Sequence, residues 1–374
     1  MRKTAAVFFG GRSCENEISI ITGTMVCNVL RGGAYDVYPV YIAQDGGMFT
    51  GEALFDVASF RKEPKEFLPA RLDGGTLYAA RGKKLRPLAR IDVLLNCCHG
   101  MGGEDGAVAG LADLNGVANA SPAMAASAVF MDKCMTKFIA AALGVRTLPS
   151  FRVAEADFAR RGAFAVRCIE ERLGYPVIVK PARQGSSIGV FVAEDRESLL
   201  FALRAGFAYD TLLLAEKYLQ DRREINCAAY RSRGEIVVSP CEEPKTSHKI
   251  LTFADKYTDG GKGDRGDFPA RLPAQTAEHI RGVTKLLYRR MQLRGIVRAD
   301  FLLGGGQVYF NEMNTVPGSL AWYLFCKNLA DFRTVLQAVL EEGERDFAAR
   351  SSKRLLKNSG VLSAFPSAGR KTRR

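Results

Sequence analysis

Residues 298–314 read Arg-Ala-Asp-Phe-Leu-Leu-Gly-Gly-Gly-Gln-Val-Tyr-Phe-Asn-Glu-Met-Asn, and this stretch decides the fold. Two runs of strand-forming residues flank a triple-glycine turn, Gly304 to Gly306. Such a pattern predicts a β-hairpin, because glycine tolerates the positive φ angles that a tight turn requires. The polar residues of both runs recur at every second position, so each strand is expected to present them on one face.

The polar residues of this hairpin predict a cation site. Arg298 and Asp300 share one face of the first strand, and Glu312 and Asn314 share one face of the second. With the turn centred on the middle glycine, Arg298 is expected opposite Glu312, and Asp300 opposite Phe310. Two carboxylates and an amide oxygen would then converge, and such hard oxygen ligands suit Mg²⁺ or Mn²⁺. The alternative is a cross-strand Arg–Glu ion pair on a solvated sheet.

The composition indicates a folded, non-membrane protein with more than one domain. A chain of 374 residues is long for one core, and its 47% hydrophobic and 25% charged residues are ordinary for a globular protein. The apolar run at the N-terminus is only about seven residues long, which favours a buried first strand over a signal peptide. Nine cysteines without a Cys-x-x-Cys pair favour neither a disulfide framework nor a zinc site, so a reducing cytoplasm is expected.

The net charge of +13 is concentrated at one end of the chain. Residues 346–374 hold eight basic residues and one acid, so this segment supplies +7 of the total. Its Ser, Gly, Lys and Arg composition predicts a disordered, solubilising tail. A nucleic-acid-binding surface would instead require basic residues gathered on a folded face with aromatic partners, so no nucleic acid partner is expected.

Strand and helix patterns divide the chain into three folded units. Residues 1–125 alternate strands and helices and predict an open parallel α/β layer, with ligands at the carboxyl ends of its strands. Residues 126–218 form a central unit that begins with a helix over 127–143. Residues 219–345 contain the hairpin and a polar loop over about 242–272. Strands are expected over 5–9, 37–42, 91–97, 151–153, 176–180, 189–193, 212–218, 224–231 and 235–240, and helices over 18–30, 106–116, 164–173, 198–206, 274–291 and 329–342.

Two further segments suggest nucleotide binding. A strand ending in Lys180 leads into a loop of small residues, Gly185-Ser186-Ser187, whose backbone N–H groups could approach phosphate oxygens. A strand edge at Glu216 could read an adenine edge, and Glu224 could accept hydrogen bonds from ribose. The alternatives are an ordinary hairpin turn and a charged edge strand. The chain contains neither a P-loop sequence nor a dinucleotide-binding glycine fingerprint.

Taken in order, these segments resemble the ATP-grasp fold and, more narrowly, the D-alanine–D-alanine ligases. The resemblance covers roughly residues 4–345. It implies an α/β protein with an N-terminal open parallel domain, two ATP-grasp subdomains and a homodimeric assembly. The matching motifs are Gly10-Gly-Arg-Ser-Cys-Glu-Asn-Glu-Ile-Ser19, His99-Gly-Met-Gly-Gly-Glu-Asp-Gly106, Met131-Asp-Lys133, Val179-Lys-Pro181, Gln184-Gly-Ser-Ser187, Glu216-Lys217, Asp255-Lys-Tyr257, Arg298-Ala-Asp300 and Glu312-Met-Asn-Thr-Val-Pro-Gly318.

The resemblance implies an ATP-dependent reaction in two steps, which supplies a peptidoglycan precursor. ATP phosphorylates the carboxylate of one D-alanine, and the amine of a second D-alanine then attacks the acylphosphate. A D-alanine–D-serine ligase, or another ATP-grasp carboxylate–amine ligase, is the nearest alternative. A nucleotide- or nucleic-acid-binding protein without catalytic activity is the alternative from a different class.

The resemblance also implies roles for individual residues. The amino acid substrates are expected at Glu17, His99, Arg298, the N–H of Gly318, Ser319 and Leu320. ATP is expected at Lys133, Lys180, Ser186, Ser187, Glu216, Lys217, Glu224 and Lys256. Two Mg²⁺ or Mn²⁺ ions are expected at Asp300, Glu312 and Asn314. Glu17, Ser186 and Tyr257 match a hydrogen-bonded trio that closes the polar loop over the site as a lid.

Three departures from the family pattern stand out. Phe253 replaces a common tyrosine, and Gln184 replaces a common glutamate before the Gly-Ser-Ser loop. Between Gly318 and Ser319 the chain lacks several residues that are found in some relatives, and similarly shortened sequences include D-alanine–D-serine ligases. The presence of Tyr257 favours an amine over a hydroxy acid as the second substrate.

Overall fold

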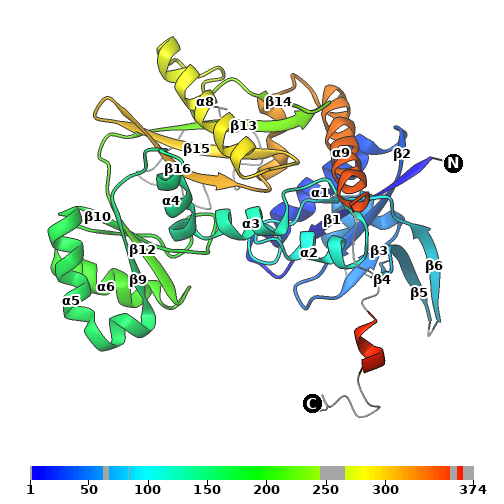
Figure 1. Ribbon diagram of the computed structural model, residues 1–374, viewed down its shortest axis with the longest axis horizontal. Helices are drawn as coiled ribbons and strands as arrows, with labels where there is room; N and C mark the ends of the chain where they lie inside the picture. Colours follow the sequence, from blue (N-terminus) through cyan, green and yellow to red (C-terminus); the bar gives the residue numbers. More distant parts are fainter. Residues whose placement is uncertain (1, 62–66, 83, 245–265, 354–359, 365–374) are drawn as a thin grey trace.

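Three β-sheets and the helices that cover them form the protein, seen in a computed structural model that describes residues 2–61, 67–82, 84–244, 266–353 and 360–364 (Figure 1). The strand order is β6-β5-β4-β3-β2-β1-β7-β8 in the first sheet, β11-β10-β12-β9 in the second and β14-β13-β15-β16 in the third. These sheets follow one another along the chain.

The first sheet has a parallel half and an antiparallel half. Its parallel strands are β1 (Lys3–Gly10), β2 (Tyr35–Ile42), β7 (Val93–Asn96) and β8 (Ala118–Asn119), and they confirm the predicted open α/β layer. The segment 45–90, which the sequence pattern left unplaced, extends this sheet with β3 (Met48–Thr50), β4 (Leu68–Asp73), β5 (Thr76–Arg81) and β6 (Lys84–Arg90). Short 3₁₀ turns η1 (Glu52–Phe55) and η2 (Val57–Arg61) lie between β3 and β4, and α2 (Ala107–Leu114) follows β7.

Helix α1 (Asn16–Leu30) packs tightly on strand β1 at a glycine. A Cβ atom on Gly23 would lie 2.2 Å from a ring carbon of Phe9, so no larger residue fits there without movement. Phe9 is completely buried, and β1 is buried from Ala5 onward. A strand covered on both faces reads as a continuous apolar run, as this one does.

The second sheet is antiparallel and carries two helices. It contains β9 (Ser150–Ala154), β10 (Val177–Pro181), β11 (Phe191–Ala193) and β12 (Leu212–Lys217), with α5 (Glu155–Leu173) and α6 (Arg196–Gly206) packed on it.

The single helix predicted over 127–143 is wrong, because two helices occupy this region. They are α3 (Met124–Met131) and α4 (Lys133–Ala142), separated by Asp132. The Asp132 carboxylate accepts hydrogen bonds from the N–H groups of Cys134 and Met135, at 2.8 and 3.0 Å. A side chain that satisfies free N–H groups in this way starts a new helix, and the chain changes direction here.

The third sheet holds the predicted hairpin. Its strands are β13 (Arg223–Ser232), β14 (Glu235–Val238), β15 (Val297–Gly304) and β16 (Gln307–Asn314), with α8 (Ala274–Arg290) packed on β13 and β14. After the 3₁₀ segment η3 (Gly318–Leu324), helix α9 (Leu329–Ser351) contacts α1, β8 and β13 and so ties this sheet to the first one (Figure 1).

The predicted register of the hairpin is wrong by one residue next to the turn and by two residues at Arg298 and Asp300. Gly304 pairs with Gln307, so the turn contains only two glycines, and a β-bulge follows between Asp300 and Phe301. Asp300 consequently lies opposite Glu312, while Phe301 lies opposite Phe310. The prediction extended one unbroken register from the turn along both strands, whereas the extra residue of a bulge shifts the pairing and the facing of every residue beyond it.

The end of the chain also differs from prediction. Residues 346–351, predicted to belong to the tail, are helical, because α9 continues to Ser351, and a short 3₁₀ turn η4 (Val361–Ala364) follows. Arg350 lies in the last turn of α9 and donates to Asp113 at 3.2 Å.

The unit boundaries at 125/126 and 218/219 stay predictions. None of the described helices combines the length and apolar character needed to cross a membrane.

Candidate active site

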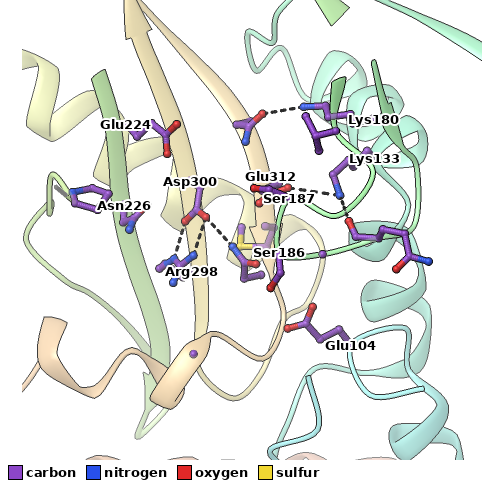
Figure 2. A pocket seen from close by; sticks show the side chains of 18 of the residues that line it. Glu104, Lys133, Lys180, Ser186, Ser187, Glu224, Asn226, Arg298, Asp300 and Glu312 are labelled. Atoms are coloured by element: carbon purple, nitrogen blue, oxygen red, sulfur yellow. Dashed lines mark hydrogen bonds and ion pairs between the residues drawn. The ribbon is translucent and has the colours of Figure 1, made fainter. Parts of the chain in front are cut away.

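A cavity of about 750 Å³ lies where the three sheets meet. Its walls come from the loops after β1 and β7, the Gly-Ser loop after β10, the end of β12, and the facing strands β13, β15 and β16. Figure 2 shows acidic and basic side chains pointing into it from both sides. The predicted site residues that line it are His99, Lys133, Lys180, Ser186, Ser187, Glu216, Lys217, Glu224, Arg298, Asp300, Glu312, Asn314, Gly318 and Ser319.

Arg298, Asp300 and Asn314 form a compact group on the hairpin, and Figure 2 shows Arg298 beside Asp300. The guanidinium of Arg298 donates to both carboxylate oxygens of Asp300, at 2.7 and 2.8 Å, and the amide of Asn314 donates to Asp300 at 2.8 Å. Burial disfavours the charged guanidinium, but Asp300 outweighs this effect and raises the pKa of Arg298. Tyr323, which sequence reasoning missed, lines the same cavity.

Two lysines on the opposite wall are held by acceptors. Lys133 donates to the backbone oxygen of Gln184 at 2.6 Å and lies 3.7 Å from Glu312. Lys180 donates to Glu216 at 2.7 Å and to Asn311 at 3.4 Å. Asn311 is the residue inserted by the bulge, so the bulge places neighbouring side chains against two lysines.

Glu216 accepts from a second lysine, Lys137, which sequence reasoning also missed. The Glu216 side chain is 1% exposed, and burial opposes its ionisation, but Lys137 and Lys180 outweigh burial and lower its pKa to about 2. One signal could have revealed Lys137: it lies four residues after Lys133 on one helix, a spacing that places both on the same face. The predicted contact between Glu216 and adenine stays a prediction.

The structure corrects the assignment of Glu17. Helix α1 begins at Asn16, so Glu17 lies in its first turn, exposed and outside the cavity wall. Glu15, in the turn before the helix, is 7% exposed and lines the cavity, where its carboxylate accepts a hydrogen bond from Ser186. The motif contains two glutamates, and only the position of the helix start distinguishes them.

The Gly-Ser loop approaches this carboxylate closely. A Cβ atom on Gly185 would lie 3.0 Å from an oxygen of Glu15. Ser186 and Ser187 both adopt left-handed backbone conformations, with φ of 49° and 58°. Such angles are uncommon for residues other than glycine, and they cluster at functional loops.

His99 is buried and links the loop after β7 to two other segments. A backbone carbonyl can only accept, so Nδ1 carries the proton and donates to Val316 at 2.8 Å. Nε2 then accepts from the hydroxyl of Thr22 at 2.9 Å, and the Thr22 oxygen accepts from the N–H of Ser319 at 3.2 Å. Glu104 lies 3.8 Å from Nδ1, and burial raises the pKa of its carboxyl.

The segment after Gly318 contradicts one prediction. Ser319, Leu320 and Ala321 form a left-handed turn, with φ of 49°, 48° and 48°. This turn buries Leu320 in the core and directs its N–H to the oxygen of Pro317 at 2.8 Å. Leu320 therefore does not line the cavity, and its N–H is already bonded, so the predicted contact to a substrate carboxylate is wrong for Leu320 in this conformation.

Other predicted ATP residues are placed only in part. Lys217 and Glu224 line the cavity, and Glu224 lies 3.5 Å from Arg222. Lys256 and Tyr257, with Phe253, lie outside the described residues. The predicted trio therefore has two members in view, with Glu15 in place of Glu17.

The oxygen atoms of Asp300, Glu312 and Asn314 form a donor set that fits a divalent cation. Asp300 and Glu312 face each other across the hairpin, and both carboxylates and an amide are the hard ligands that Mg²⁺ accepts. No group of three His, Cys, Asp or Glu side chains with metal-binding geometry occurs in the described part of the chain. A cation here would therefore need further oxygens from water or a bound phosphate, as is usual for Mg²⁺.

Comparison with known proteins places this geometry in a family. The family models described as "D-ala D-ala ligase N-terminus" and "D-ala D-ala ligase C-terminus" match residues 4–121 and 139–339. The chain belongs to the D-alanine–D-alanine ligase family. It is 33% identical to the D-alanine–D-alanine ligase of Thermosipho melanesiensis over 91% of this chain and 93% of that protein.

Solved structures agree with this family assignment. The crystal structure of the D-alanine–D-alanine ligase from Helicobacter pylori covers 91% of this chain and 98% of its own, with a TM-score of 0.74 and 28% identity. The VanG D-Ala:D-Ser ligase from Enterococcus faecalis covers 93% of this chain and all of its own, with a TM-score of 0.74. Its 23% identity shows a shared fold only. Family membership confirms the predicted ATP-grasp fold and the predicted class, an ATP-dependent ligase.

Proposed function

We propose that this protein joins two D-alanine molecules into D-alanyl-D-alanine at the expense of ATP, supplying a peptidoglycan precursor in the cytoplasm. One observation carries the proposal. A single cavity places Arg298, Asp300 and Glu312 on one wall, and Lys133 and Lys180 on the other. Such an arrangement suits a reaction in which negative charge develops on phosphoryl and carbonyl oxygens.

The lysine wall would bind the nucleotide. Lys133 and Lys180 would contact the phosphates, and the N–H groups of the loop at Ser186 and Ser187 would approach the same oxygens. Lys217 and Glu216 would lie at adenine, and Glu224 at ribose. Lys256 would join the phosphates from the predicted lid. Lys133 and Lys180 now donate to protein oxygens, so nucleotide binding would exchange these two acceptors for phosphate oxygens.

The hairpin wall would hold the cations. Asp300, Glu312 and Asn314 would bind two Mg²⁺ or Mn²⁺ ions, which when bound supply positive charge beside the nucleotide phosphates. Asp300 now accepts from Arg298 and Asn314, so it would share its oxygens between these donors and a cation.

The first D-alanine would lie between Glu15 and Arg298. The Glu15 carboxylate would fix the substrate ammonium, while Ser186 holds that carboxylate in place. His99 would lie near this substrate, with its ring held by the hydrogen bond from Nδ1 to the backbone oxygen of Val316. Arg298 and the N–H of Gly318 would stabilise the oxygen that gains negative charge when the second amine attacks.

The second amino acid would lie beside Ser319, whose hydroxyl would contact its carboxylate. Tyr257 would close the lid over it and exclude water. D-Serine is the second candidate for this position. The specific observation that favours it is the short left-handed turn directly after Gly318, which places the backbone N–H of Ser319 3.2 Å from the hydroxyl oxygen of Thr22, and both residues line the cavity.

The test is a product assay with purified protein, ATP, Mg²⁺ and mixed D-alanine and D-serine. We expect phosphate release that depends on D-alanine, with D-alanyl-D-alanine as the main product by mass. A mixed D-alanyl-D-serine product would favour the second candidate. Phosphate release no higher than with ATP alone would refute both. Salt-sensitive nucleic acid binding that needs residues 346–374, without ligase activity, would support the alternative of a nucleic-acid-binding protein without catalytic activity. We also propose a homodimer, which light scattering tests.

A further inference from the structure

Lys137 lies behind the cavity wall, and the sequence predicted no role for it. It projects from α4 with a side chain only 9% exposed, and it does not line the cavity. Its ammonium donates to one oxygen of Glu216, while Lys180 donates to the other at 2.7 Å. One carboxylate with 1% exposure is therefore shared by two buried ammonium groups.

The two lysines differ in what else they can reach. Lys180 lines the cavity and is also 3.4 Å from the amide oxygen of Asn311, so it can face a ligand (Figure 2). Lys137 is not among the residues that line the cavity, and burial lowers its pKa. A buried carboxylate without a counter-ion is strongly unfavourable, so Glu216 needs one lysine to remain whenever the other turns away.

We propose that Lys137 is a positioning residue, the permanent counter-ion of Glu216 that frees Lys180 to bind the nucleotide's phosphates. The inference deepens the proposed function and rests only on its nucleotide-binding half. Without Lys137, the Glu216 anion would depend on Lys180 alone and would hold that lysine back from the phosphates. Lys137 thus acts through two other side chains and never touches the ligand.

The decisive measurement compares the affinities of ADP and adenosine, by calorimetry, in the absence of any amino acid. Lys137→Met is expected to weaken ADP about tenfold, the scale of one charged hydrogen bond, and to change adenosine less than about twofold. Lys137→Arg, which keeps the charge, should retain most of the ADP affinity. A loss shared equally by ADP and adenosine would overturn the proposal, because it would place the effect at the adenine end.

A second variant tests the direction of the effect. Adding Glu216→Gln to Lys137→Met removes the anion that retains Lys180, so the ratio of ADP to adenosine affinity should recover toward the wild-type ratio. Glu216→Gln alone should leave that ratio unchanged or raise it, even if adenosine binding weakens. This single variant keeps the test available if Lys137→Met fails to fold. A double variant no better than Lys137→Met would contradict the inference.

A matched control separates positioning from stability. Glu342 is another buried glutamate, 3% exposed, paired with Arg345 and far from the cavity wall. Arg345→Met should lower the melting temperature without altering the ADP-to-adenosine ratio. If the wild type binds ADP but makes no dipeptide, only the proposed function fails. If it makes the dipeptide and Lys137→Met shows no selective ADP loss, only this inference fails.

Discussion

Ser186 donates a hydrogen bond to Glu15, although 171 positions separate the two residues in the chain. The contact joins the Gly-Ser loop after β10 to the turn before α1, and both residues line the cavity. It ties the first sheet to the second at the place where the proposed first substrate would sit. The relative position of the first and second sheets is therefore coupled to binding of that substrate.

Glu15 and Glu17 offer a direct test of this arrangement. Glu15→Gln should weaken use of the first D-alanine about ten- to hundredfold, because a charge-assisted contact to the ammonium is lost. Glu17→Gln, two residues away and exposed, should stay within about twofold of wild type. Steady-state kinetics with D-alanine varied at saturating ATP measures both. A larger loss for Glu17→Gln would assign the substrate ammonium to Glu17 instead.

Arg298 is expected to act on turnover more than on nucleotide affinity. Arg298→Ala should lose at least about 10²-fold in kcat, the scale for removing one donor to a developing oxyanion. ADP affinity should change little, since the lysine wall is intact. Dipeptide formation and ADP binding are measured on the same preparation. Turnover within a few-fold of wild type would reject the role of Arg298.

The hairpin carboxylates should set the magnesium requirement. Treatment with EDTA should abolish turnover, and added Mg²⁺ should restore it. Asp300→Asn and Glu312→Gln should each raise the half-saturating Mg²⁺ concentration about tenfold or more, because each removes a charged oxygen ligand. Glu224→Gln, in the same cavity, serves as the control: it should weaken ATP without changing the Mg²⁺ requirement.

Glu216 should make the fold sensitive to acid. Its pKa is about 2 in the folded state against an ordinary value of 4.5, so the folded protein binds fewer protons than the unfolded chain between these values. Its contribution, on the order of 3 kcal/mol, is present above pH 4.5 and is lost as the pH falls toward 2. Denaturant unfolding across this range should show a steeper loss for wild type than for Glu216→Gln. If the free energy of unfolding fell equally with pH in wild type and in Glu216→Gln, the expectation would be contradicted.

Two glycines should respond to alanine in opposite directions. Gly23→Ala places a methyl group 2.2 Å from Phe9, so it should lower the free energy of unfolding by about 1–3 kcal/mol. Gly282 lies in α8, and no atom lies within 4 Å of the place that an alanine methyl group would take, so Gly282→Ala should raise it by about 0.5–1 kcal/mol. Urea titration of both variants decides. Destabilisation by Gly282→Ala would show that helix propensity does not govern that site.

Much of the fold could be predicted because its strands carry local signals. The apolar run of β1 and the glycine turn of the hairpin each specify an element from neighbouring residues alone. The bulge at Asn311 and the helix break at Asp132 were not predicted. A bulge depends on pairing with another strand, and a capping residue looks like any other surface aspartate until the chain turns there.

Where a motif contains a single candidate residue, that residue lines the cavity as predicted. Where a segment contains several candidates and only the three-dimensional structure selects one, the residue was missed. Lys133, Lys180 and Asp300 line the cavity as expected. Glu15 and Lys137 depend on where a helix starts and which face it buries. The left-handed turn that removes Leu320 from the cavity is formed by Ser319, Leu320 and Ala321. None of them is a glycine, the residue that usually indicates such a turn in a sequence.

The bulge in β16 has a consequence for how this strand tolerates change. Ordinarily, neighbouring residues of a strand point to opposite sides, yet Asn311 and Glu312 both reach the cavity, each toward a different lysine. Deleting a single residue there would restore regular alternation and leave one of those lysines without its acceptor. The length of β16 is therefore constrained as tightly as the identity of its polar residues.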